Sequence, residues 1–94
     1  MALYKNMEEP TDGVPVTAEG MVQVIEDEFK NHFGDIGRYI VRKQVANMKG
    51  NKAVEIKDIP ALIEALSSAT VKIIGANCSK DLRKRLRRRC GLPV

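Results

Sequence analysis

The apolar residues of segment 59–74 recur at the three- and four-residue spacing of an α-helix over about four turns. Polar residues fill the remaining positions, so the pattern predicts an amphipathic helix with one buried face. Asp58 and Pro60 are typical of a helix start, and Gly75 interrupts the pattern. We expect this helix to be the centre of an all-α fold, with other helices covering its apolar positions: Ile59, Leu62, Ile63, Leu66, Ala69, Ile73 and Ile74.

Two shorter amphipathic helices precede this segment. The first begins after Thr17, a typical N-cap residue, and ends at Gly34, which suits a left-handed cap. Asp35 is placed to cap the second helix, which ends at Gly50. Because the turn between them is so short, we expect a helical hairpin. Its apolar positions are Met21, Val22, Ile25, Phe29 and Phe33, and then Ile36, Ile40, Val41, Val45 and Met48.

A last helix is predicted after a break at residues 75–77, with Asn77 or Ser79 as its cap. The alternative is one continuous helix over 59–90, which would be about 48 Å long and would carry its basic half beyond the core. We therefore favour a bend at Gly75. Four residues at four-residue spacing form the predicted buried strip of this helix: Cys78, Leu82, Leu86 and Cys90.

The remaining segments show no helical period. Residues 1–16 combine two prolines and a glycine with polar residues, and we expect a flexible N-terminal arm. In 51–57, Val54 and Ile56 alternate with polar residues, but a lone strand has nothing to pair with, so a loop anchored by these two is predicted. The whole is one small four-helix domain over 17–94, with a helical hairpin, a long central helix and a basic C-terminal helix.

The start of the chain lacks the basic residues and the apolar run of a secretory signal, and no later run is expected to span a membrane. A cytoplasmic protein with no membrane contact is expected. Cys78 and Cys90 would lie about 18 Å apart on one helix, whereas a disulfide needs Cα atoms within about 7 Å. Both are expected to be thiols, which agrees with a reducing compartment.

Charge is distributed unevenly along the chain. The segment 80–89, KDLRKRLRRR, holds seven of the 16 Lys and Arg residues and one of the 12 Asp and Glu residues, so its net charge is +6. The rest of the chain carries −2 on the same count. Such a division indicates an interaction surface.

On a helix of 100° per residue, Leu82 and Leu86 share one narrow strip, with Arg85 and Arg89 beside it. Arginine stays charged and matches phosphate oxygens bidentately, so the opposite face suits a nucleic-acid backbone, with little sequence preference. The predicted contact residues on that face are Lys80, Arg83, Lys84, Arg87 and Arg88.

Other interpretations of the basic run stay open. It can be a solvated face, cations favoured near a helix C-terminus, or a helix docked on the acidic residues 26–28 of the first helix. An acidic protein partner or a membrane surface would also attract it, although a membrane helix usually inserts Trp, Phe and several Leu.

Catalytic and metal sites are not predicted, and neither is a cofactor or a small-molecule substrate. His32, the single histidine, has Glu28 one turn earlier but no nucleophile or pocket nearby in the pattern. His32, Cys78 and Cys90 do not reproduce the spacing of a zinc site. With two Tyr, two Phe and no Trp, the chain is also poor in the rings that stack on bases.

The pattern therefore favours a small non-enzymatic binding or regulatory module whose basic C-terminal helix contacts nucleic-acid phosphates. The alternative is a protein-interaction adaptor, as a homodimer formed through the apolar edges of the first two helices. In that case the basic helix meets an acidic partner or maintains solubility. The pattern of a helical hairpin followed by a long helix is shared by many unrelated small proteins and indicates no particular family.

Overall fold

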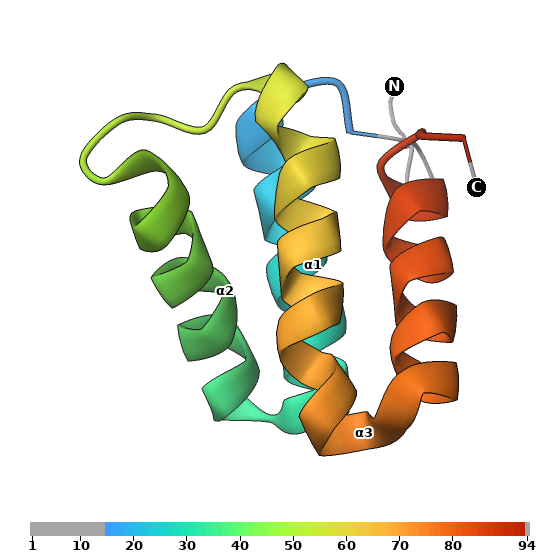
Figure 1. Cartoon of the computed structure of the whole chain (residues 1–94). Coiled ribbons are helices and arrows are strands. Elements are labelled where there is room, and N and C mark those ends of the chain that lie inside the picture. Colours follow the sequence, from blue (N-terminus) through green and yellow to red (C-terminus); the bar gives the residue numbers. More distant parts are fainter. Residues whose placement is uncertain (1–14, 94) are drawn as a thin grey trace, which may run out of the picture.

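Three α-helices and one short 3-10 turn make up the part of the chain that the structure, a computed structural model, describes, residues 15–93. They are α1 (Ala18–Phe33), α2 (Asp35–Lys49), η1 (Ile56–Asp58) and α3 (Ile59–Arg89), as Figure 1 shows. The all-helical prediction is confirmed, since residues 15–93 contain no strand. Most of the predicted flexible arm, residues 1–14, lies outside the described residues.

The third helix bends sharply at Gly75, as the sequence predicted. Gly75 has φ 85° and ψ 164°, a conformation open to glycine and strained for residues with a side chain. The chain before and after it forms two arms that lie side by side (Figure 1). We call residues 59–74 the first arm and residues 76–89 the second arm. The predicted third and fourth helices correspond to these two arms, which follow one another without a loop and form the single element α3, so residues 15–93 contain three helices where four were predicted.

The core lies between α1, α2 and the two arms. In Figure 1, α1 and the first arm occupy the middle, with α2 on one side and the second arm on the other. The core is aliphatic apart from Met21, Phe29 and Cys90, and every helix contributes to it. The most deeply buried side chains are Ile25, Phe29, Val41, Ile59, Leu62, Ile63, Leu66, Thr70, Leu82, Leu86 and Cys90.

The helical hairpin has its predicted start and its predicted turn. Thr17 caps α1, because its side chain accepts a 3.0 Å hydrogen bond from Gly20 N. Gly34 has φ 74°, and its N–H donates to Lys30 O at 2.8 Å. Asp35 does not cap α2 as predicted, since it is itself the first helical residue and makes no side-chain cap bond.

Several apolar residues predicted to be buried are exposed. Ile36 in the first turn of α2 and Ile73 in the last turn of the first arm are 60% and 61% exposed. Both lie at helix ends, where neighbouring helices no longer cover the apolar face. Ile56 is also exposed, so only Val54 packs the connecting loop against the core.

The strip predicted for the second arm is shifted by one residue at its start. Cys78 is exposed, and Ser79 is buried in its place instead of capping the helix. The bend at Gly75 sets this register, because it turns position 79 toward the first arm. Cys90 is buried as predicted, and both cysteines are free thiols.

Candidate nucleic-acid interface

The second arm presents the basic run with one face buried. Leu82, Leu86 and Cys90 are each at most 2% exposed. The Cys90 thiol lies 3.9 Å from Met21 O of α1, so the end of the arm rests on that helix. The seven cations therefore occupy the sides and the outer face of the arm.

Buried hydroxyl groups fix the second arm against the first. Ser79 Oγ donates to Ser67 O at 2.6 Å, and Thr70 Oγ1 lies 3.3 Å from Ser79 Oγ. Thr70 also donates to Ser67 O, and Ser67 donates to Ile63 O one turn earlier. All three hydroxyl groups are thus satisfied within the fold, and they set the register of the two arms.

Glu64 on the first arm receives two of the predicted contact residues. Arg83 Nη1 lies 3.0 Å from Glu64 Oε2, and Arg87 Nη1 lies 3.7 Å from the same atom. Arg87 also donates from Nε to Pro93 O at 2.6 Å. In this structure both guanidinium groups therefore point along the side of the arm and have partners within the protein.

Glu28 on α1 receives the two arginines that flank the other side of the strip. Arg85 Nη1 lies 3.5 Å from Glu28 Oε1, and Arg89 Nη1 donates to Glu28 Oε2. The Glu28 side chain is 9% exposed. Docking on the acidic residues 26–28 was one of the open interpretations, and it holds for Glu28 alone: Glu26 pairs with Arg42 at 3.6 Å, and Asp27 accepts from Gln23 at 3.5 Å.

The outer face of the second arm carries the other three predicted contact residues, Lys80, Lys84 and Arg88. They are exposed, and none of them forms an ion pair with a carboxylate of residues 15–93. Since they are one helical turn apart, they form a row about 12 Å long. We call these three residues the outer row. Asp81 is exposed beside it and lowers its net charge.

Glu64 is one of the polar residues of segment 59–74 that the helical pattern places on the face away from the core, and sequence reasoning missed it as a partner of the basic run. The bend places Ser67 opposite Ser79, and one turn further from the bend it places Glu64 opposite Arg83. Glu64 lies eleven residues before Gly75 and Arg83 eight residues after it, so a fold-back that pairs equally distant residues would not have indicated this contact. The partial match at Glu28 came from charge complementarity alone.

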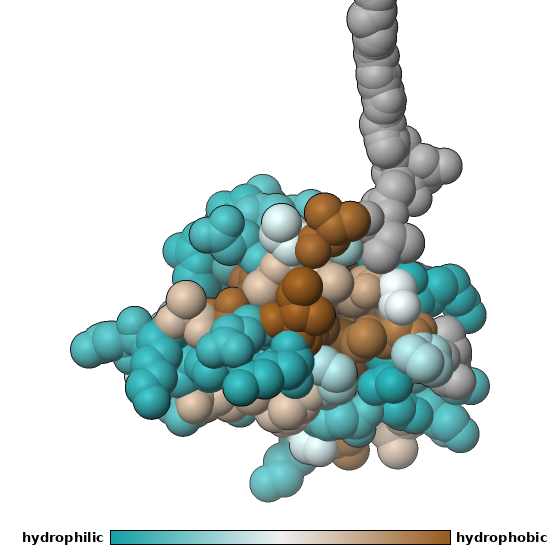
Figure 2. Space-filling model, turned by 90° about the horizontal axis from the view of Figure 1, so that it is seen from above, coloured by the Kyte–Doolittle hydropathy of each residue, from teal (hydrophilic) through white to brown (hydrophobic). Residues whose placement is uncertain are grey.

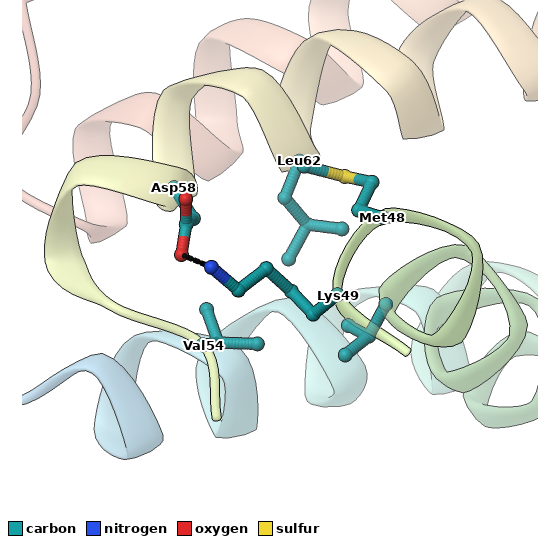
Figure 3. A pocket seen from close by; sticks show the side chains of 6 residues that line it. Met48, Lys49, Val54, Asp58 and Leu62 are labelled. Carbon is teal, nitrogen blue, oxygen red and sulfur yellow. Dashed lines mark ion pairs between the residues drawn. The ribbon is translucent and has the colours of Figure 1, made fainter. Parts of the chain in front are cut away.

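A second group of charged residues lies between the end of α2 and the start of α3. Lys49 Nζ is 2.9 Å from Asp58 Oδ2, and Val45, Met48, Val54 and Leu62 surround the pair (Figure 3). The space between these side chains admits no water molecule. The hydrogen bond to Asp58 raises the pKa of Lys49, so the amine stays protonated and is a poor nucleophile. This pair ties the connecting loop to α2.

Of the residues considered for catalysis, His32 and Glu28 differ in exposure and in their partners. His32 is exposed next to Phe33, with ring centroids 6.1 Å apart, while Glu28 is turned to the arginines of the second arm. Within residues 15–93, no three His, Cys, Asp or Glu side chains gather as a metal site.

We expected no run of residues that could span a membrane. This expectation is wrong in terms of length and composition, because one segment of the described residues is long and apolar enough. Segment Ile56–Arg89 contains an 18-residue window that is long and apolar enough, with 33% of that window buried. Core helices of water-soluble proteins pass the same test. Here Ile59, Leu62 and Leu66 of this segment pack against the other helices.

Comparison with protein-family models, with curated proteins and with solved structures found no match to this chain.

Proposed function

We propose that this protein is a small non-enzymatic binding module whose second arm contacts nucleic-acid phosphates without strong sequence preference. The observation that carries the proposal is the outer row, in which Lys80, Lys84 and Arg88 are exposed along one helix face. None of these three cations forms an ion pair with a carboxylate of the described residues. The hydrogen bond from the Ser79 hydroxyl to the backbone carbonyl of Ser67 holds the arm in place, which limits the ordering cost of binding.

The geometry favours backbone contact over base recognition. Cations one turn apart, about 6 Å, can follow consecutive phosphates, and neutralising a phosphate releases condensed counterions. The exposed aromatic residue of the described chain, Tyr39, lies on α2 under Lys43 and not on the second arm. Stacking on bases therefore adds nothing at the outer row. Weak binding that depends strongly on salt is expected.

The test is a binding titration with a short fluorescent DNA duplex over a series of salt concentrations. For three phosphate contacts, a plot of log K against log[salt] is expected to have a negative slope with a magnitude of about 2.7 or more. The variant K80Q/K84Q/R88Q is expected to lose binding while helicity is kept. The matched control K30Q/K43Q/K72Q removes three exposed cations of α1, α2 and the first arm, outside the basic run, and is expected to bind nearly as well. Equal loss in both variants, or binding that ignores salt, would refute the proposal.

A protein-interaction adaptor is the second candidate, and exposed apolar side chains favour it. Ile36 and Tyr39 on α2 are both 60% exposed, on the edge expected to pair in a homodimer. Apolar surface also gathers within a hydrophilic rim on the face seen in Figure 2. Light scattering separates the two candidates: a stable dimer that does not bind the duplex at low salt supports the adaptor.

A further inference from the structure

A hollow of about 210 Å³ lies between the two arms of α3, beside the outer row. Lys80 is part of the outer row and also lines the hollow. A phosphate backbone that follows the outer row would therefore pass the opening of this hollow. The lining residues are Glu64, Ser67, Ser68, Val71, Ala76, Ser79, Lys80 and Arg83.

The polar groups of the hollow differ in whether they are available. The hydroxyl groups of Ser67 and Ser79 donate to backbone carbonyls of the first arm and are buried. Ser68 and Lys80 are exposed, and Arg83 is 33% exposed at its side chain. A hydroxyl, an ammonium and a guanidinium group thus line the open part of the hollow, and all three donate hydrogen bonds to anions.

Glu64 is the one carboxylate among the residues that line the hollow, and it is paired with one of these donors, Arg83. Its carboxylate accepts the 3.0 Å bond from Arg83, and its side chain is 54% exposed. Ion pairs in solvent are weak, so a phosphate can replace this carboxylate at little cost. After such an exchange Arg87 would keep its 2.6 Å hydrogen bond to Pro93 O. Within the described residues, Glu64 is the acceptor that Arg83 bonds, so Arg83 would be free to bond the phosphate.

The buried carboxylate on the other side of the arm behaves differently. Glu28 is 9% exposed, and it bonds both Arg85 and Arg89. Removing these arginines would leave a carboxylate in the interior without partners, which is costly. Arg85 and Arg89 therefore hold the arm on α1, and the exchange is confined to the exposed pair.

From this contrast we infer that the hollow is a phosphate site that opens by exchange: a backbone phosphate displaces Glu64 from Arg83 and is held by Arg83, Lys80 and Ser68. The inference rests on the proposed function and adds a fourth contact to the three of the outer row. Glu64 then acts as an internal competitor of the nucleic acid.

The experiment repeats the duplex titration with single variants and charge-matched controls. With the fourth contact, the wild-type slope is about −3.6, and R83Q reduces it to about −2.7. K30Q, which removes one exposed cation of α1, leaves the slope unchanged. E64Q removes the competitor and is expected to tighten binding by up to about fivefold. The control E19Q removes one negative charge at an exposed position in the first turn of α1 and is expected to tighten binding by clearly less.

The outcomes separate the two proposals. If the wild type binds with the outer row but R83Q keeps its slope and E64Q equals E19Q, the exchange site is refuted and the proposed function stands. If no protein of the series binds the duplex at low salt, both are refuted. Circular dichroism of R83Q and E64Q checks that the second arm stays helical in each variant.

Discussion

Gly37 of α2 lies so close to α1 that a Cβ atom at this position would stand 2.1 Å from the carbonyl oxygen of Phe29. The nearby atoms are backbone, which cannot move aside as a flexible side chain would. This contact brings the two helices of the hairpin together directly after the turn. It also explains the glycine that the sequence places in the first turn of α2, where its low helix propensity is unfavourable.

Gly37→Ala is therefore expected to destabilise the protein although alanine is the better helix former. Overpacking against a fixed backbone costs about 1–3 kcal/mol or more, which exceeds the gain of about 1 kcal/mol in helix propensity. Urea unfolding followed by circular dichroism measures the difference. Asn47→Ala, at an exposed position of the same helix, serves as control and is expected to change stability by less than about 0.5 kcal/mol. A Gly37→Ala variant as stable as the wild type would contradict the close contact.

Ser79→Ala tests the hydroxyl contact between the two arms. The change removes the 2.6 Å bond to Ser67 O, and it leaves Thr70 without its contact to Ser79. We expect a loss of about 1–2 kcal/mol in the free energy of unfolding, as for other buried hydrogen bonds. The exposed Ser68 provides the matched control, since Ser68→Ala removes the same atom without such a bond. Equal stability of both variants would mean that the hydroxyl groups do not hold the arms.

Glu28→Ala and Glu64→Ala compare how much each of the two carboxylates that form ion pairs with the basic run contributes to stability. Glu28 is nearly buried and Glu64 is half exposed, while each bonds two arginines. Because the arginines at Glu28 remain partly in solvent, we expect a cost of about 1–2 kcal/mol there and of about 0–1 kcal/mol at Glu64. Thermal unfolding at low and high salt distinguishes the variants. A larger loss at Glu64 would contradict the assignment of Glu28 as the structural partner.

Sequence pattern was sufficient for the parts of the fold that depend on local chemistry. The i+4 spacing of Met21, Ile25 and Phe29 gave α1 its buried face, and Gly75 broke the long helix where its lack of a side chain allows the bend. Exposure at helix ends could not be predicted in the same way. Ile36 and Ile73 fit the helical period, but burial there depends on where neighbouring helices stop.

The candidate site was predictable only as a set of charges. Helical spacing placed Lys84 and Arg87 on one broad face, but the choice between solvent and a carboxylate depends on what lies opposite in space. That choice is made by the bend, which brings Glu64 to Arg83 and Arg87 and leaves Lys84 outward. A long-range contact of this kind has no local signal in the chain.

The ion pair of Lys49 and Asp58 predicts how stability depends on pH. The hydrogen bond from Lys49, with a second from Glu55 N, lowers the pKa of Asp58 below its ordinary value of 3.8. The same hydrogen bond raises the pKa of Lys49 above its ordinary value of 10.5. Asp58 therefore contributes stability that is present above pH 3.8 and is lost as the pH falls through its lowered pKa.

Lys49 contributes stability below pH 10.5 that is lost as the pH rises through its raised pKa. The variant Asp58→Asn removes both contributions, so it is expected to be less stable than the wild type by a constant amount near neutral pH. This difference should shrink below the ordinary pKa of Asp58 and above that of Lys49, as measured by urea unfolding across the pH range. Glu55→Gln is expected to show a much smaller difference, because the Glu55–Lys57 pair is 3.5 Å long and exposed on both sides and because Glu55 is the weakest contributor to the raised pKa of Lys49. A gap between wild type and Asp58→Asn that persists unchanged at both extremes would show that the pair does not stabilise the fold through its charges.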